Sequence, residues 1–277
     1  MKSILVIEPL EKKQKLKIAL GSDWHWGEEA TSTKKIKAVC ADIASHNPDV
    51  LVLAGDFNGG VSGHSAVNFT LDIVRKYLND VNILSCLGNH DYWIRGNKVR
   101  RHDPHPSSGI EYNRPTMSKW TKNYEKIVES FRKFGVHFLD EDGIWRMDSK
   151  FPGYAIVGHT GWYNYHNPPT NDFRYMPNSI EASHPEMNKK AYKKLEEHLS
   201  KLEDRDIKRI FVSHFPVVEL KTENLSFGGN PRVGELLRNE FNCEIFLNGH
   251  FHERHNGPLR FECGSDYGHP KYLIINI

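Results

Sequence analysis

The stretch VNILSCLGNHD, residues 81–91, decides the fold. Its first seven residues form a short apolar run of the kind found in a buried strand. The next four, Gly88-Asn89-His90-Asp91, pack poorly but offer an amide, an imidazole and a carboxylate. In open α/β sheets, ligand sites form at the carboxyl ends of strands. The stretch therefore predicts a strand that delivers polar side chains to a functional edge.

Other apolar runs in the chain end in the same way. Polar residues follow the runs 16–20, 50–54, 207–212 and 244–247, in the order SDWH (22–25), GD (55–56), SH (213–214) and NGHFH (248–252). Helical patterns between Ser32 and Asn47 and over 66–78 separate the first three strands. Alternation of strands and helices predicts βαβ units and a parallel sheet.

The remaining elements complete an α/β pattern. Helices are predicted over 118–134, 185–202 and 233–241, and strands over 3–7, 136–139, 144–147 and 154–157. His159 follows the last of these strands, and we interpret it as a histidine at the edge of the site. Leu259–Cys263 and Tyr272–Ile277 resemble a closing antiparallel pair. No interdomain linker interrupts residues 1–277, which predicts a single domain.

Composition sets broad limits on the class of protein. The chain has 277 residues, 38% of them hydrophobic, and a net charge of +2, which favours neither a nucleic-acid nor a membrane partner. The four cysteines form no CxxC pair, so buried thiols in a reducing compartment are expected. The apolar start is too short for a signal peptide, and no run is long enough to span a membrane. We expect a soluble cytoplasmic protein. The sequence does not predict its oligomeric state.

Two irregular segments interrupt the pattern near the expected site. The insert 95–117 is basic: from Arg95 to Trp120 the net charge is +4, counted as six Lys and Arg against two Asp and Glu. Such a loop fits an anionic substrate such as a nucleic acid, or equally a solvated surface. The insert 161–185 is rich in aromatic residues, which fit stacking on a base or cover for the sheet. Both alternatives stay open for both inserts.

The strand ends bring a set of ligating side chains to one edge. The set is Asp23, His25, Asp56, Asn89, His90, Asp91, His214, His250 and His252. Singly, Asp23 and Asp56 also fit helix N-caps, and Asn89 fits a turn. Together, nitrogen and oxygen donors without a thiolate are typical of Zn, Mn or Fe sites. The set is too large for one ion and predicts two.

The order of these motifs resembles that of the calcineurin-like metallophosphoesterase superfamily. The resemblance runs from Leu16 to the end of the chain and implies a four-layer α/β/β/α sandwich with mixed sheets and the site at the carboxyl ends of the strands. It implies that Asp23, His25 and His252 bind one metal and that Asp56 bridges both. Asn89, His214 and His250 would hold the second metal. The catalytic residues would be His90, which faces the scissile phosphate, and Asp91, which orients His90.

The resemblance also implies an activity. Two ions of Mn, Fe, Zn or Ni would generate a hydroxide that attacks phosphorus. Gly55-Asp56-Phe57-Asn58 lacks the Asp-Arg of the protein phosphatases, and Ser22-Asp23-Trp24-His25 is similar to the opening motif of the repair nucleases of this superfamily. We therefore expect a phosphodiesterase acting on a nucleotide or nucleic acid. The alternatives are a phosphomonoesterase acting on a small metabolite or protein, and a non-catalytic scaffold.

Overall fold

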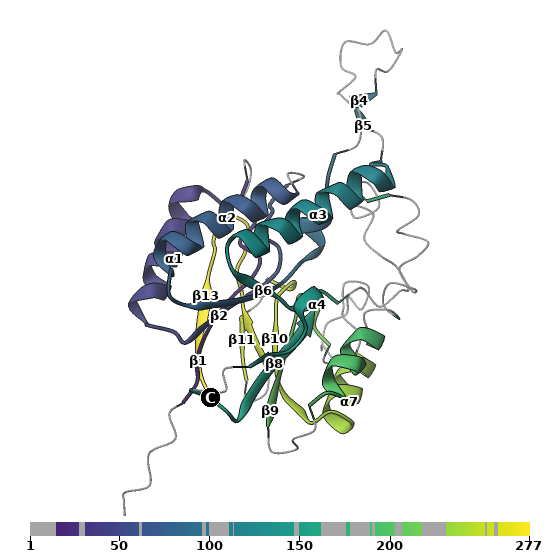
Figure 1. The fold of residues 1–277 in the computed structure, drawn as a ribbon. Helices are drawn as coiled ribbons and strands as arrows, with labels where there is room; N and C mark the ends of the chain where they lie inside the picture. Colours follow the sequence, from purple (N-terminus) through teal and green to yellow (C-terminus); the bar gives the residue numbers. More distant parts are fainter. Residues whose placement is uncertain are drawn as a thin grey trace, which may run out of the picture.

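The architecture is known from a computed structural model of the chain. It describes residues 15–27, 31–60, 63–95, 98–99, 111–112, 114–146, 150–161, 176–177, 189, 192–202, 207–217, 231–252, 254–257 and 260–277. Two β-sheets lie between two layers of helices (Figure 1). The predicted strand at 3–7 and most of the insert 161–185 lie outside the described residues.

The first sheet contains the three strands that precede the motifs at 22–25, 55–56 and 88–91. Its order is β13-β1-β2-β3-β6. The strands are β1 (Lys17–Gly21), β2 (Val50–Ala54), β3 (Asn82–Cys86), β6 (Val136–Phe138) and β13 (Tyr272–Asn276). β1, β2, β3 and β6 run parallel, as the βαβ pattern predicts, and β13 is antiparallel to β1.

The second sheet contributes the other two strand ends of the site. Its order is β11-β12-β10-β9-β8-β7. The strands are β7 (Trp145–Arg146), β8 (Tyr154–His159), β9 (Lys208–Ser213), β10 (Cys243–Asn248), β11 (Arg254–Asn256) and β12 (Arg260–Cys263). The central strands β8, β9, β10 and β12 are parallel, so their carboxyl ends share one edge.

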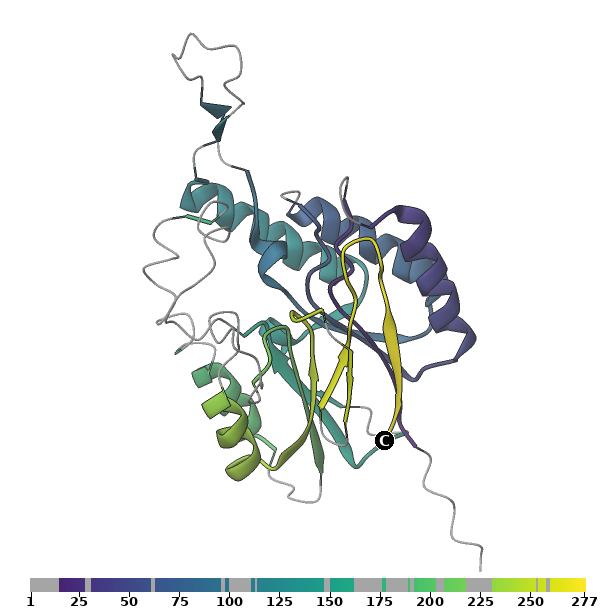
Figure 2. The same ribbon diagram turned by 180° about the vertical axis from the view of Figure 1, so that it is seen from behind.

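Helices cover the outer face of each sheet. Those on the first sheet are α1 (Thr33–Ser45), α2 (His64–Tyr77) and α3 (Met117–Lys133). The second sheet is covered by α7 (Pro231–Asn239) and by the helical residues 192–199, as the views from opposite sides show (Figures 1 and 2). The short elements are η1 (Asn89–Tyr92), α4 (Leu139–Asp142) and the hairpin of β4 (Lys98–Val99) and β5 (Glu111–Tyr112), which stands out beyond α3 (Figure 1).

The side chains of β2 show why four layers form. All five residues of this strand are buried. Leu51 and Leu53 face the helices of the first sheet, whereas Val50, Val52 and Ala54 face the second sheet. Successive side chains of a strand point to opposite faces, so an uninterrupted apolar run requires cover on both. A third core lies between the second sheet and its own helices. The four-layer α/β/β/α prediction is thus confirmed.

One local prediction is wrong. Leu259–Cys263 and Tyr272–Ile277 do not pair with each other: β12 pairs with β10 and β11, whereas β13 crosses to the first sheet and pairs with β1. β13 buries Leu273 between the sheets and packs Ile274 against the helices of the first sheet. The prediction that the cysteines are buried thiols is confirmed for all four.

Close packing of β8 against β9 gives a first testable prediction. A Cβ atom at Gly158 would overlap the carbonyl oxygen of Val212, whereas one at Gly153 would meet no atom within 4 Å. Overpacking of a core costs about 1–3 kcal/mol. We expect Gly158→Ala to lower the free energy of unfolding by about that amount and Gly153→Ala to change it far less. Chemical denaturation of both variants measures the difference, and equal stabilities would contradict the packing described here.

Candidate metal centre and active site

The predicted side chains do converge on the edge where both sheets end. Asp23 and His25 follow β1, Asp56 follows β2, and Asn89 begins η1 after β3. His214 follows β9, and His250 and His252 follow β10. The backbone ties these ends together, since Asp23 N donates to Gly55 O at 3.0 Å and Gly249 N donates to His214 O at 3.1 Å.

The first group consists of Asp23, His25 and His252. The two Nε2 atoms of the histidines lie 3.2 Å apart, and His252 Nε2 lies 3.5 Å from Asp23 Oδ1. His25 Nδ1 lies 3.2 Å from Asn58 O, and His252 Nδ1 lies 3.2 Å from Asp266 Oδ1. Both of these oxygens are acceptors, so each Nδ1 is the protonated nitrogen. In the neutral rings the two Nε2 lone pairs therefore face each other and a carboxylate.

The second group consists of Asn89, His214 and His250. His214 Nδ1 donates to Ala54 O at 2.9 Å, which leaves the Nε2 lone pair of the neutral ring pointing away from the strand. His214 Nε2 lies 3.1 Å from Asn89 Oδ1 and 3.2 Å from His250 Nδ1. His214 Nε2 and Asn89 Oδ1 are thus two acceptors at close range, whereas His250 Nδ1 donates or accepts according to its tautomer. Two acceptors at this distance repel each other unless a cation lies between them.

Asp56 lies between the two groups. Its Oδ2 is 3.8 Å from His25 Nε2 and 3.5 Å from His214 Nε2, and its Oδ1 accepts a 2.9 Å hydrogen bond from His90 N. Three sets of three side chains have donor atoms within 4.8 Å of one another: Asp23–His25–His252, Asp23–Asp56–His214 and His25–Asp56–His90. Asp56 belongs to two of them, as a shared carboxylate would. The third set includes His90, so this geometry also permits His90 to act as a ligand.

The spacing and charge state of these groups fit transition metals. Two nitrogens bound at about 2.1 Å to one tetrahedral ion lie about 3.4 Å apart, and the separations above are close to that. Burial lowers the pKa of His25 to about 3 and that of His214 well below its usual value, so both rings are neutral near pH 7. A metal-bound imidazole has to be neutral. The donor set therefore suits two transition metal ions.

Asp91 has a different place from the predicted one. Its Oδ2 accepts hydrogen bonds from Asp56 N at 2.9 Å and Gly88 N at 2.8 Å, and its Oδ1 accepts from Asn58 N at 3.1 Å. The carboxylate thus binds the backbone that carries Asp56, and no described contact joins it to the His90 ring. The expectation that Asp91 orients His90 is corrected accordingly. A Cβ at Gly88 would overlap Asp56 Oδ1, so only glycine leaves room for this carboxylate.

Several residues around the site have no signal in the strand-end pattern. Tyr267, in the turn before β13, stacks on His25 with ring centroids 4.2 Å apart, and its hydroxyl lies 3.3 Å from His90 Nε2. Asp266 holds the ring of His252. Trp93 stacks on His90 at 3.7 Å between centroids. Their chain neighbours look like ordinary turn residues, so only the tertiary structure reveals them.

His159 does not join the site. It is the last residue of β8, is 4% exposed, and its ring packs edge-on against Phe211. Its Nδ1 accepts a 2.7 Å hydrogen bond from Gly161 N. The interpretation of His159 as a histidine at the edge of the site is therefore not supported by its surroundings, which are those of the outer core.

The backbone at the site is strained. Five candidate ligands have left-handed φ angles: Asp23 at 54°, His25 at 44°, Asp56 at 56°, His250 at 81° and His252 at 57°. Only two other described non-glycine residues, Asn47 and Asn242, share this conformation. A residue held in a disfavoured backbone region costs of order 1–3 kcal/mol, and such residues are concentrated at functional sites. The strand ends thus accept strain to direct these side chains inward.

This strain gives a second prediction. At His252, glycine relieves the left-handed backbone and alanine does not, while both remove the imidazole. We expect His252→Gly to unfold with a free energy about 1 kcal/mol higher than His252→Ala in metal-free protein. His255, exposed in the β11 strand, serves as the control, and there the alanine variant should be the more stable one. Thermal unfolding of the four variants measures these differences. If glycine and alanine ranked in the same order of stability at both positions, the backbone strain at His252 would be contradicted.

Comparison with known proteins agrees with this geometry. Residues 16–254 match the calcineurin-like phosphoesterase family, and the chain belongs to that family. The protein is accordingly a metal-dependent hydrolase of phosphoester bonds that works with two transition metal ions. No curated protein matches the sequence significantly. Among the described residues, no helix has the length and apolar character needed to cross a bilayer.

Solved structures share the fold at low sequence identity. The protein TT1561 of Thermus thermophilus is 13% identical with a TM-score of 0.52, over 95% of this chain and 99% of its own. A dimetal phosphatase from Danio rerio is 12% identical with a TM-score of 0.53, over 94% and 98%. The purple acid phosphatase PPD1 from yellow lupin is 13% identical with a TM-score of 0.50, over 96% of this chain and 46% of its own.

Proposed function

We propose that the protein hydrolyses phosphodiesters, with a nucleotide or nucleic acid as the substrate. The observation that carries this choice is the position of Tyr267. The residue is 45% exposed, although its ring stacks on His25 and its hydroxyl approaches His90. An exposed aromatic ring beside the reacting centre offers a surface on which a base can stack, and such stacking tolerates any base.

We assign the metal ligands as the sequence motifs imply. Asp23, His25 and His252 would hold one ion and Asn89, His214 and His250 the other, with Asp56 between them. The close approach of the ligand atoms within each group supports this assignment. When bound, two such ions supply a nucleophile from water near neutral pH and offset charge on the phosphoryl oxygens.

The protein's own residues position and assist the reaction. Burial and the neighbouring histidines hold the pKa of His90 well below its usual value, so we propose a neutral ring that donates a hydrogen bond to the phosphate or its leaving oxygen. Trp93 stacks on this ring and limits its movement. Asp91 would act through the backbone of Asp56, and Asp266 would fix the orientation of His252.

A phosphomonoesterase is the second candidate. Two of the proteins that share the fold are described as phosphatases, the dimetal phosphatase from Danio rerio and the lupin purple acid phosphatase. Likeness of fold at this identity does not carry a substrate from one protein to another. As for location, four buried, unpaired cysteines favour a reducing compartment, and we propose the cytoplasm.

A comparison of two nitrophenyl esters tests the function. Chelator-stripped protein is resupplied with Mn, Zn, Ni, Fe or Mg, and hydrolysis of bis(p-nitrophenyl) phosphate is compared with that of p-nitrophenyl phosphate. We expect metal-dependent turnover with the diester preferred. Asp56→Asn should lose at least about a hundredfold in kcat, since the shared carboxylate is removed. Preference for the monoester would favour the second candidate, and full activity of Asp56→Asn would contradict a shared ligand.

The role of His90 gives a further prediction. If His90 assists the phosphate and is not a ligand, His90→Ala should lower kcat about 100-fold or more while metal content, measured by mass spectrometry, stays at two ions. The ligand atoms of His25, Asp56 and His90 also lie close together, so His90 could instead bind a metal ion. Loss of one ion from His90→Ala would make this residue a ligand and would overturn the assignment.

A further inference from the structure

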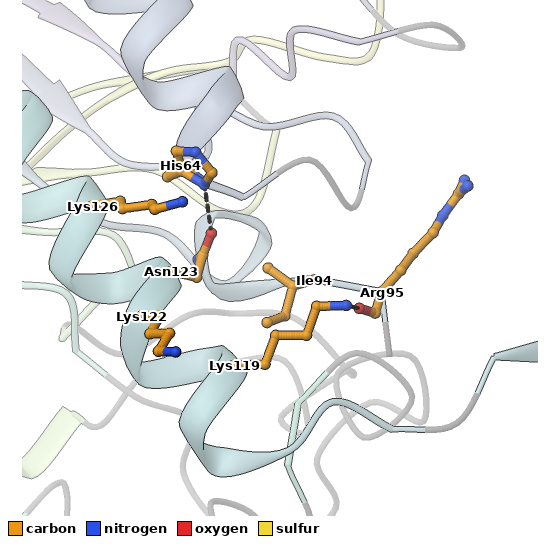
Figure 3. Close-up of a pocket in the computed structure, with 7 residues that line it drawn as sticks. All are labelled: His64, Ile94, Arg95, Lys119, Lys122, Asn123 and Lys126. Atoms are coloured by element: carbon orange, nitrogen blue, oxygen red, sulfur yellow. Dashed lines mark hydrogen bonds between the residues drawn. The ribbon is translucent and has the colours of Figure 1, made fainter. Parts of the chain in front are cut away.

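A basic cavity lies apart from the candidate ligands, between α2 and α3 (Figure 3). Its volume is about 370 Å³. The lining residues are His64, Ile94, Arg95, Lys119, Lys122, Asn123 and Lys126. Four of these carry a full positive charge and none is acidic. A cavity lined by one sign of charge concentrates ligands of the opposite sign, so this one favours anions.

The charges of the cavity come mainly from one face of α3. Lys119, Lys122 and Lys126 are spaced by three and four residues, which places them on the same side of the helix. Like charges at this spacing repel each other and destabilise a helix. Lys122 and Lys126 are exposed, and their ammonium groups form no hydrogen bond or ion pair with any described residue. A bound anion would relieve that repulsion.

The wall of the cavity also offers oriented polar groups. Asn123 is 7% exposed, and its Oδ1 accepts hydrogen bonds from His64 N at 2.9 Å and His64 Nδ1 at 3.2 Å. These two bonds hold the Asn123 side chain in place at the wall of the cavity. His64 is also the first residue of α2, a 14-residue helix whose N-terminus adds positive potential. The sequence provided no argument for a role of either residue.

The chain links this cavity to the catalytic edge. Arg95 follows His90 by five residues, and an extended chain spans at most about 3.6 Å per residue, so their Cα atoms lie within about 18 Å. Lys119 Nζ donates to Arg95 O at 2.6 Å, which holds this segment against α3. Successive phosphates of a nucleic-acid strand advance about 3.4 Å or more. A strand at the metal centre would therefore reach the cavity within a few nucleotides.

We propose that this cavity binds a backbone phosphate of a nucleic-acid strand whose scissile phosphodiester lies at the metal centre. The inference rests on the proposed function and specifies its substrate as a polymer rather than a mononucleotide. The lysines act as point charges on the backbone, so binding is independent of base sequence and sensitive to salt.

The test compares two double variants with equal loss of charge. Lys122→Gln/Lys126→Gln removes two lysines of the cavity. Lys34→Gln/Lys37→Gln removes two exposed lysines of α1 and is the control. The substrates, assayed with metal-supplied protein, are bis(p-nitrophenyl) phosphate and labelled single-stranded DNA or RNA of about 15 nucleotides. Fluorescence anisotropy measures binding of the same strands.

We expect the cavity variant to lose about tenfold or more in kcat/KM and in affinity for the strands, through KM and Kd. The slope of log affinity against log salt should fall by about 0.7, as expected for the loss of one phosphate contact on a single strand. Turnover of the small diester should not change, and the control should behave as wild type. Equal losses in both variants, or none, would overturn the proposal.

Three further outcomes separate this inference from others. If wild type hydrolyses the small diester but neither binds nor cleaves the strands, the cavity proposal fails while the phosphodiesterase stands. If no ester is hydrolysed with any metal, the proposed function fails, and anisotropy still decides about the cavity. Inorganic tripolyphosphate tests whether the cavity binds a small free anion. That reading would replace the proposal if tripolyphosphate raised the thermal midpoint of wild type but not of the cavity variant, while both proteins bound and cleaved the strands equally.

Discussion

The site depends on the hydrogen bonds that the carboxylate of Asp91 accepts from the backbone. It accepts hydrogen bonds from the backbone amides of Asp56, Gly88 and Asn58, and so binds the end of β2 to the end of β3. Burial raises the pKa of Asp91 to about 7, whereas these amide hydrogen bonds favour the charged form. The bond from Asp56 N to Asp91 helps to hold Asp56 in its left-handed backbone conformation at the centre of the ligand set. The place of Asp91 is structural, beneath the atoms that react.

Strain and repulsion are concentrated at the same edge. Five candidate ligands adopt left-handed φ angles, and the Nε2 atoms of His25 and His214 lie 3.1–3.8 Å from the ligand atoms of His252, Asp56 and Asn89. Both features oppose stability in the absence of cations. The four layers compensate for them with three apolar cores, and β2 contributes to two of these. Metal binding converts this local cost into affinity, because the ligands are already held at coordinating distance.

Substrate selection involves parts of the chain outside the metal motifs. Tyr267 provides an exposed ring beside His90, and α3 provides a row of lysines beside the segment that leaves η1. The basic character of residues 95–120 was apparent in the sequence, but three of the seven lining residues come from α3 beyond that segment, and His64 comes from α2. The positive charge of the cavity is thus supplied by Arg95 and α3 together rather than by one loop.

The sequence by itself determined the layered fold and the convergence of the candidate ligands. Uninterrupted apolar runs such as Val50–Ala54 demand cover on both faces, and parallel strands bring their carboxyl ends, and the polar residues that follow, to one edge. Only the tertiary structure decided what these residues contact. Asp91 binds backbone amides instead of His90, β13 joins the first sheet instead of pairing with β12, and Tyr267 reaches the site from a turn. The physical reason is that strand order and side-chain contacts depend on residues distant in the chain, which periodicity and spacing do not encode.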